Sequence, residues 1–273
     1  MPHKRIIFRE RGQGQVLLLL HGYGGSVHHW EDVASSLSRR FRIVVPNLGH
    51  LYLSTDKLSF SSQVEVLGKF IEFNFPNQKV HLAGLSFGGA LAWGVAHQYP
   101  QLVGKCTLIN PIVTEPMKNF LPIELRLFFK LPLNITAIYL ILSTPLGRTF
   151  LKKTALIFRD EKSPEGGFVI EQLKGRKLQF LAYMIHNFKA VLRGEDWNIW
   201  SKKIQGFCSP GKIRLIYSRE DLLFSEGVYQ VFATHIGCED LIQLSGAGHL
   251  ASKNCPELIS KHILEFLETS LSA

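Results

Sequence analysis

One junction constrains the fold of this chain more than any other feature of its sequence. From Val80 to Ala96 the chain reads VHLAGLSFGGALAWGVA, so a strand-like apolar run ends in Gly-Leu-Ser-Phe-Gly-Gly and turns at once into a helix-like pattern. Ser86 lies between Gly84 and Gly88 in a G-x-S-x-G arrangement, where the turn is too tight for side chains two residues on either side of the serine. Packing alone does not require this serine, since alanine would fill the turn equally well. The stretch therefore predicts a strand, a tight turn and a helix, with the serine hydroxyl standing clear at the end of a sheet.

The first 110 residues alternate strand-like and helix-like segments, which is typical of a mainly parallel sheet with helices on both faces. We predict strands at 5–8, 16–20, 42–47, 79–85 and 103–110, and helices at 28–41, 60–74 and 87–100. Ser61 or Ser62 is a candidate N-cap of the second helix. The pattern then becomes helix-like at 122–132, 135–158 and 171–193. Strand, helix, strand and helix return at 212–218, 227–236, 240–246 and 257–271.

The predicted organisation is an α/β core at 1–111 and 201–273 with a helical cap inserted at 112–200. A chain of 273 residues with 46% hydrophobic residues can bury a core of this size. The four cysteines form no C-x-x-C pair, which argues against a zinc site and a disulfide framework. The apolar run before His21 is only five residues long, too short for a signal peptide, so we expect a cytoplasmic protein. The net charge of +9 comes from dispersed Lys and Arg without interleaved aromatics, which argues against a nucleic-acid partner.

A nucleophilic serine needs a base to accept its proton and an acid to orient that base. His249 is the candidate base, because LSGAGHLAS places it late in the chain on a glycine-lined loop directly after a predicted strand. The acid should follow the strand IRLIYS. Asp221 is favoured over Glu220, because the loop must extend a few residues past the strand to reach the imidazole. Asn110 stands where an acid after the preceding strand would be needed, which excludes that alternative position.

Backbone N–H groups are the candidate donors for the oxyanion that forms when Ser86 attacks a carbonyl. LLLLHGYGGS places a sharp turn directly after a strand, where the N–H of Tyr23 can point at the same oxyanion as the N–H of Phe87. The helix that begins at Phe87 also directs its first amides toward the developing charge. His21 is interpreted as a structural residue that holds this turn rather than as a base.

Together these residues resemble the α/β-hydrolase superfamily, in its cap-bearing esterase, lipase and C–C hydrolase branch. The resemblance is carried by HGYGGSVHHW, GLSFGG, YSRED and GAGHLAS, and Trp30 matches an aromatic residue often found on the helix after the oxyanion loop. It implies an eight-stranded type of core, here with a shortened first hairpin, a helical cap over the site, and neither metal nor cofactor. Serine at position 86 argues against the haloalkane dehalogenases and epoxide hydrolases, which carry Asp there.

One stretch departs from the pattern of this branch. Its members usually carry Asp-x-x-Gly-His-Gly-x-Ser after the fourth strand, and this chain reads NLGHLYLS from Asn47 to Ser54. Asn47 replaces the acid, one residue fewer precedes Gly49, and Leu51 replaces the second glycine. Because the resemblance places this loop beside the active site, the departure bears on pocket shape and substrate and leaves the three candidate catalytic residues untouched.

The predicted cap is basic as well as apolar. Residues 112–200 contain 13 Lys or Arg and 8 Asp or Glu. Such helices suit an acyl chain on their inner face and peripheral contact with an anionic membrane on their outer face. Cap helices that bury an apolar face against the core and leave their charges in water explain the pattern nearly as well. The candidate substrate-binding residues are His50, Phe128, Tyr139 and His186.

The sequence therefore predicts a serine hydrolase that cleaves carboxylic esters, with a small-molecule ester or acyl substrate. A thioesterase or acyltransferase of a biosynthetic pathway would use the same residues, and a C–C bond hydrolase is a third interpretation. In a different class, the fold would act as a ligand-binding protein with little turnover, and Ser86 would then not react with an acylating probe.

Overall fold

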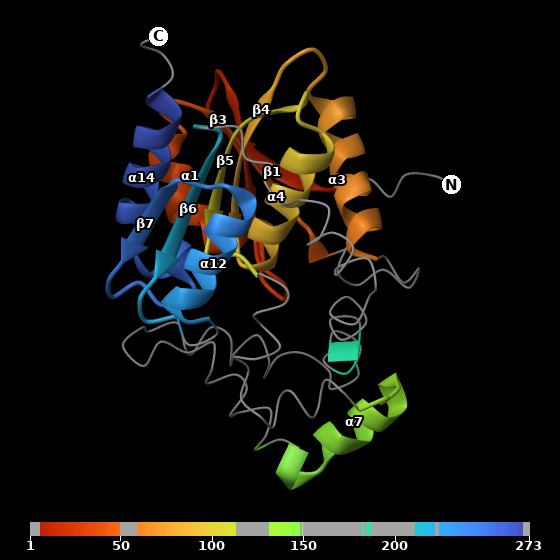
Figure 1. Cartoon of the computed structure of the whole chain (residues 1–273). Coiled ribbons are helices and arrows are strands. Elements are labelled where there is room, and N and C mark those ends of the chain that lie inside the picture. The colour runs from red at the N-terminus through yellow and green to blue at the C-terminus, as the bar shows by residue number, and fades with distance from the viewer. Residues whose placement is uncertain are drawn as a thin grey trace.

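A computed structural model describes the chain at residues 6–49, 59–112, 131–147, 149, 182, 185–186, 211–221 and 224–269. A seven-stranded sheet runs through the centre in the order β1-β3-β2-β4-β5-β6-β7 (Figure 1). β1 pairs with β3 in antiparallel fashion, and the other neighbouring pairs are parallel. The strands are β1 (Phe8–Arg11), β2 (Val16–Leu20), β3 (Arg42–Pro46), β4 (Val80–Leu85), β5 (Val103–Ile109), β6 (Ile213–Ser218) and β7 (Asp240–Leu244).

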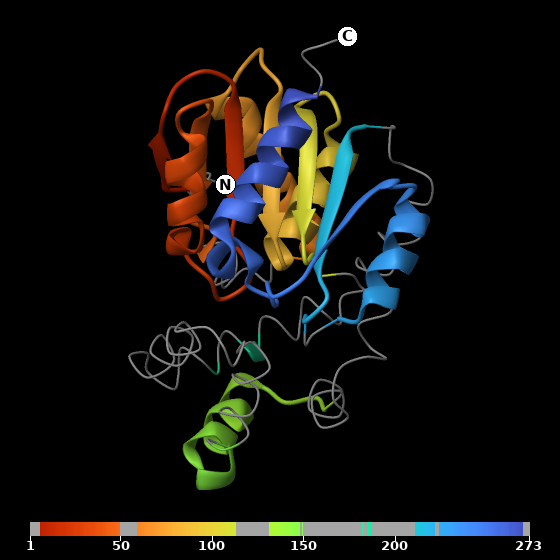
Figure 2. The same cartoon turned by 90° about the vertical axis from the view of Figure 1, so that its left-hand side faces the viewer.

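Helices cover both faces of this sheet, as the alternating pattern predicts. The helices are η1 (Val27–Trp30), α1 (Glu31–Leu37), α3 (Phe60–Asn74), α4 (Phe87–Gln98), α7 (Ile135–Ser143), α12 (Glu226–Ile236), α13 (Ala251–Asn254) and α14 (Pro256–Glu268). In Figures 1 and 2, α1 and α14 lie on one face, and α3, α4 and α12 lie on the other. Leu18 and Leu20 of β2 belong to the core under α3 and α4, whereas Leu17 and Leu19 belong to the core under α1 and α14. This alternation of side chains along one buried strand builds both cores at once.

Four local predictions were wrong. The helix predicted at 28–41 is the 3-10 turn η1 followed by α1, which ends at Leu37, and the helix predicted at 135–158 is interrupted after Ser143, where α7 ends. The first strand is Phe8–Arg11 rather than 5–8, because β1 lies at the edge of the sheet and its last three residues, Arg-Glu-Arg, are exposed, so hydrophobicity does not mark it. The N-cap of α3 is Ser59, whose side chain accepts a hydrogen bond from the N–H of Ser62 at 3.1 Å. Ser61 and Ser62 have helical positions in the first turn, and an N-cap requires the extended backbone that only Ser59 has.

Helix α7 belongs to the segment predicted as a cap. Ile138 and Leu142 of α7 pack against Ala182, and α7 lies beyond the carboxyl ends of the strands (Figures 1 and 2). The helices predicted at 122–132 and at 171–193 lie outside the described residues, apart from Leu131 and Pro132, which are not helical, and Ala182, Ile185 and His186. The cap and its boundaries at 112 and 200 therefore stay predictions. Among the described residues, no helix is both long and apolar enough to cross a bilayer.

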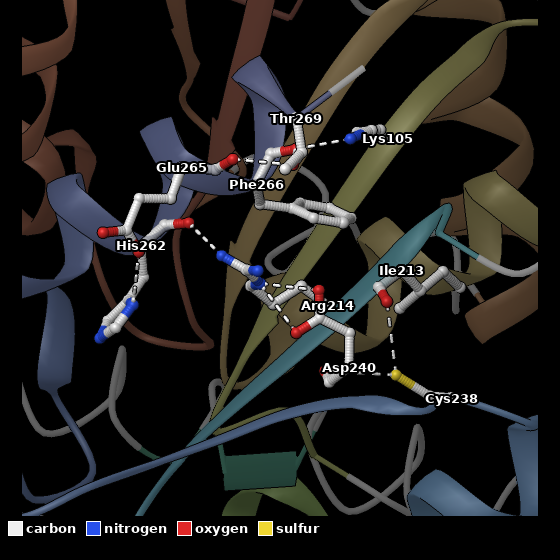
Figure 3. Close-up of polar contacts among 9 residues, drawn as sticks. All are labelled: Lys105, Ile213, Arg214, Cys238, Asp240, His262, Glu265, Phe266 and Thr269. Carbon is white, nitrogen blue, oxygen red and sulfur yellow. Dashed lines mark hydrogen bonds and ion pairs between the residues drawn. The ribbon is translucent and has the colours of Figure 1, made fainter. Parts of the chain in front are cut away.

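A polar cluster fixes α14 at the amino ends of β5, β6 and β7 (Figure 3). Nε of Arg214 donates to both carboxylate oxygens of Asp240 at 3.0 and 2.9 Å, and another guanidinium nitrogen donates to the His262 carbonyl at 2.8 Å. Nζ of Lys105 donates to the Phe266 carbonyl, and both cations lie within 5 Å of the Phe266 ring centroid, at 4.5 and 4.9 Å. Cations near the last helical turn also interact favourably with its dipole.

Candidate active site

Ser86 occupies a strained turn between β4 and α4. Its backbone has φ 57° and ψ −120°, a conformation that residues other than glycine rarely adopt. Three hydrogen bonds hold this conformation: the Ser86 N–H donates to the Ile109 carbonyl, and the Ser86 carbonyl accepts from the N–H groups of Ala90 and Ile112. Strain held by such contacts is typical of functional sites.

Glycines allow the chain to pack this closely around Ser86. A Cβ added at Gly84 would lie 2.2 Å from the Gly88 carbonyl oxygen, and one at Gly88 would lie 2.2 Å from the Leu20 carbonyl oxygen. A Cβ at Gly22 would lie 3.1 Å from the Cβ of Ser86. The glycines at 84 and 88 are therefore required by backbone contact, as the G-x-S-x-G pattern predicts.

Ser86, His249 and Asp221 lie in a continuous hydrogen-bonded chain. Nε2 of His249 lies 2.9 Å from Oγ of Ser86, and Nδ1 of His249 lies 2.9 Å from Oδ2 of Asp221. The three residues come from three different strand ends, after β4, β6 and β7, and are all buried. Because a carboxylate only accepts, Nδ1 carries the proton and Nε2 is left to accept from the serine hydroxyl. This arrangement can draw the hydroxyl proton away from Ser86.

Asp221, favoured over Glu220 from the sequence, is the carboxylate that lies within hydrogen-bond distance of His249. Glu220, the alternative, accepts a hydrogen bond from the Gly246 N–H at 2.7 Å and supports the loop before His249. Gly246 and Gly248 have φ values of 75° and 58°, so glycine is needed at both positions to bend this loop toward Ser86.

Tyr229 is a member of this site that sequence reasoning missed. Its hydroxyl donates to Oδ2 of Asp221 at 2.7 Å, so one carboxylate oxygen accepts from both Tyr229 and His249. Burial raises the pKa of Tyr229 well above its usual value, and the Asp221 charge raises that pKa further. The phenol therefore stays protonated as a donor. Tyr229 has core spacing on α12, so its sequence context indicates packing only.

The two residues whose N–H groups are the candidate oxyanion donors contact each other through their rings. Tyr23 follows the turn after β2, and its ring packs edge-on against the Phe87 ring at a centroid distance of 5.8 Å. Phe87 is the first residue of α4, so its N–H belongs to the helix turn whose amides point toward the amino end.

His21 has the structural role predicted for it. Its Nδ1 donates to the Gly22 carbonyl at 2.9 Å, and its Nε2 accepts from the Leu48 N–H at 3.0 Å. Burial lowers the pKa of His21 to about 4, which keeps the ring neutral and able to accept. The imidazole thereby joins the turn after β2 to the loop after β3, where Oδ1 of Asn47 accepts from the Gly49 N–H.

Of the four candidate substrate-binding residues, the structure describes two. Tyr139 of α7 is half-buried beside Ile138 and Leu142, and His186 is half-buried. The described contacts do not join either of them to Ser86 or His249. His50, Phe128 and the stretch from Leu51 to Ser54 lie outside the described residues. Within the described part of the chain, no three His, Cys, Asp or Glu side chains cluster as metal ligands would.

Comparison with known proteins shows which family this architecture represents. The model of the family described as "alpha/beta hydrolase fold" matches residues 15–254, which is most of the chain. The chain therefore belongs to the alpha/beta hydrolase family, and the resemblance drawn from its motifs is confirmed.

Individual relatives are more distant. An uncharacterised protein of Mycobacterium bovis is 32% identical over 108 residues, which cover 39% of this chain and 32% of that protein. Protein ABHD8 of Mus musculus is 24% identical over 264 residues, which cover 92% of this chain and 55% of ABHD8. The chain thus spans between a third and about half of the length of these relatives. A thermophilic esterase from Thermogutta terrifontis has a similar fold, with a TM-score of 0.69, 16% identity and coverage of 97% and 93% of the two chains.

Proposed function

We propose that this chain is a serine hydrolase that cleaves carboxylic esters through an acyl-enzyme. The observation that carries the proposal is the buried hydrogen-bonded chain from Ser86 through His249 to Asp221, at 2.9 Å in both steps. It joins a nucleophile, a base and an acid in the order required for acyl transfer. Membership of a hydrolase family supports the same reaction class.

In the first half of the proposed reaction, Oγ of Ser86 attacks the ester carbonyl while Nε2 of His249 accepts the hydroxyl proton. Asp221 holds the imidazole in the correct tautomer and stabilises the imidazolium, and Tyr229 holds the Asp221 carboxylate. The N–H groups of Tyr23 and Phe87 donate to the oxyanion. The tetrahedral intermediate then collapses, the C–O bond to the alcohol breaks, and His249 gives its proton to the departing alcohol.

In the second half, water replaces the alcohol. His249 accepts a proton from water as its oxygen attacks the acyl carbonyl of the acyl-enzyme. Collapse of the second tetrahedral intermediate breaks the bond to Oγ of Ser86, and His249 returns the proton to that oxygen. The products are an alcohol and a carboxylic acid, and the enzyme is restored without any cofactor taking part in the proposed steps.

The apolar character of α7 supports an acyl substrate of some length. Ile138 and Leu142 are buried, and Leu140 of the same helix is 59% exposed, so apolar side chains lie on more than one side of α7. We therefore expect a preference for medium or long acyl chains over acetyl.

Hydrolysis of p-nitrophenyl esters from acetyl to palmitoyl tests the proposal, with wild type beside Ser86→Ala. We expect the Ser86→Ala variant to lose about 10⁴-fold or more in kcat/KM, as loss of such a nucleophile does in other serine hydrolases. Ser35→Ala, on the exposed face of α1, is the matched control and should keep wild-type rates. Equal rates in wild type and Ser86→Ala would overturn the proposal, and release of acyl groups only from a thioester donor would identify a thioesterase instead.

A further inference from the structure

Asn110, directly after β5, contacts two of the three segments that carry the proposed catalytic residues. Its Oδ1 accepts from the N–H of Ser218 at 2.8 Å, and its Nδ2 donates to the Ser218 hydroxyl at 3.0 Å. The same Nδ2 donates to the carbonyls of Gly248 and His249 at 2.8 and 3.0 Å. Asn110 is fully buried, so no solvent competes for these bonds. A single amide thus joins the end of β6, three residues before Asp221, to the backbone of His249.

The third segment is bonded to the backbone beside Asn110. The Ile109 carbonyl accepts from the Ser86 N–H at 2.9 Å, and the Asn110 N–H donates to the Ile216 carbonyl at 2.9 Å. The turn at Ser86, the end of β6 and the loop after β7 are therefore all hydrogen-bonded to residues 109 and 110. Asn110 and His249 lie 139 positions apart in the sequence, so this hydrogen bond joins segments that the local chain does not hold together.

The amide of an asparagine side chain fits these contacts, and the carboxylate of an aspartate does not. An amide offers an acceptor for the Ser218 N–H and an NH₂ group for the carbonyls of the His249 loop. A carboxylate of the same shape could still accept from Ser218, but it would place negative charge against two carbonyl oxygens. Asn110 also has φ 40°, and asparagine tolerates this left-handed backbone better than most residues.

The loop that carries His249 depends on such a tether. Gly246 and Gly248 give it two flexible points. Its backbone is otherwise contacted by the side chains of Glu220 at the Gly246 N–H, Cys255 at the Gly246 carbonyl and Asn254 at the Ala247 carbonyl. The His249 imidazole contacts Ser86, Asp221 and the Phe224 ring. Among the described side-chain contacts to the backbone of this loop, only that of the Asn110 amide reaches the His249 carbonyl. A shift of this carbonyl would carry the imidazole away from Ser86, and misplacement by about 1 Å can cost on the order of 10²-fold in rate.

We propose that Asn110 is a positioning residue, whose amide sets the place of the His249 imidazole between Ser86 and Asp221. This inference rests on the proposed function, because it concerns the residue proposed as the base. Asn110 touches no reacting atom and acts through the backbone of His249. Its expected effect falls on kcat rather than on KM, because substrate binding does not depend on the proton transfer that His249 performs.

Two substitutions separate the amide from the backbone. Asn110→Asp keeps the shape and removes both donors, and Asn110→Gly keeps the positive φ while removing the side chain. Asn77→Asp is the matched control, since Asn77 also has a positive φ, of 61°, and lies exposed on a turn. Thermal unfolding and circular dichroism identify a temperature at which each variant is fully folded, and kcat, KM and the labelling rate of Ser86 by a fluorophosphonate are measured there.

We expect a fall in kcat of about 10²-fold in folded Asn110→Asp and Asn110→Gly, with KM within about twofold of wild type and a parallel fall in labelling rate. Asn77→Asp should behave as wild type. Wild-type kcat and labelling in either folded Asn110 variant would overturn the inference and leave the proposed function standing. Failure of wild type itself to hydrolyse esters or to label at Ser86 would overturn the proposed function, and the inference with it.

Discussion

At Ser86 the backbone and the side chain serve one purpose. The positive φ directs the hydroxyl toward His249. The glycines around Ser86 let β2 and α4 approach so closely that no side chain would fit between them. Gly22 lies close to the hydroxyl, since a Cβ there would lie 3.5 Å from Oγ of Ser86 as well as 3.1 Å from its Cβ.

Gly22→Ala therefore tests how precisely the nucleophile must be placed. The new methyl group would displace the Ser86 side chain by a few tenths of an ångström, and we expect kcat for ester hydrolysis to fall by about tenfold or more while the fold is kept. Gly227→Ala is the control, because Gly227 is exposed near the start of α12 and a Cβ there meets no atom within 4 Å. It should keep full activity and gain up to about 1 kcal/mol of stability from helix propensity. Wild-type kcat in Gly22→Ala would contradict this account of the turn.

Residue by residue, the sequence was informative where local pattern and chain order coincide. Ser86, Asp221 and His249 each follow a strand in the order typical of their family, and the structure brings them together as predicted. Tyr229 and Asn110 could not be found in this way. Tyr229 has the spacing of a core residue, and the bonds of Asn110 join it to residues more than 100 positions away. Such contacts depend on the register of β5 and β6, which no local pattern specifies.

Among the elements, α14 shows how charges support the sheet at the end opposite the active site. The side chain of Arg214 is 14% exposed and lies between Asp240 and the last turns of the helix. Charge-assisted hydrogen bonds in such a setting are stronger than those of exposed ion pairs.

Asp240→Asn should accordingly lower the free energy of unfolding by about 1–3 kcal/mol, because it leaves the Arg214 guanidinium without its carboxylate. Asp32→Asn is the control, since the pair of Asp32 with Lys253, at 3.5 Å, lies in a more exposed place and should cost less than about 1 kcal/mol. Urea unfolding measures both. Neither substitution should change kcat, because Asp240 begins β7 and His249 follows its opposite end. Equal losses of unfolding free energy in Asp240→Asn and Asp32→Asn would show that burial does not strengthen the pair of Arg214 with Asp240.

Strands and helices of the core were predictable because most of them are buried or amphipathic runs. α3 begins and ends at the predicted residues, 60 and 74. β1 was misplaced because an edge strand needs few apolar residues, and pairing with β3 rather than burial defines it. The predicted cap has apolar helical segments too, but their packing partners are not encoded in any local period.

For the whole molecule, buried histidines make stability depend on pH. Burial lowers the pKa of His21 to about 4, and burial together with nearby positive charges lowers that of His29 to about 4. Both side chains are buried, with relative exposures of 0% and 6%. In the unfolded chain they titrate near 6.5, so between pH 6.5 and 4 the unfolded state binds more protons and stability falls as pH falls.

Between pH 7 and pH 5, each of these histidines should remove about 2 kcal/mol of stability. His29→Gln should therefore reduce the loss of stability over this interval by about 2 kcal/mol, whereas His28→Gln, at the exposed neighbouring position, should leave it unchanged. Urea unfolding at the two pH values gives the comparison. The same pH dependence in wild type and His29→Gln would show that the buried ring contributes nothing to it.

In the proposed mechanism, His249 and Asp221 activate Ser86 as a nucleophile. Labelling of the folded protein with a fluorophosphonate, followed by peptide mass spectrometry, tests it most directly, with His249→Gln and heat-unfolded wild type as controls. We predict rapid labelling confined to the peptide that contains Ser86, and little or none in either control. Absence of labelling in wild type, or labelling of Ser86 at the same rate in His249→Gln, would contradict the account.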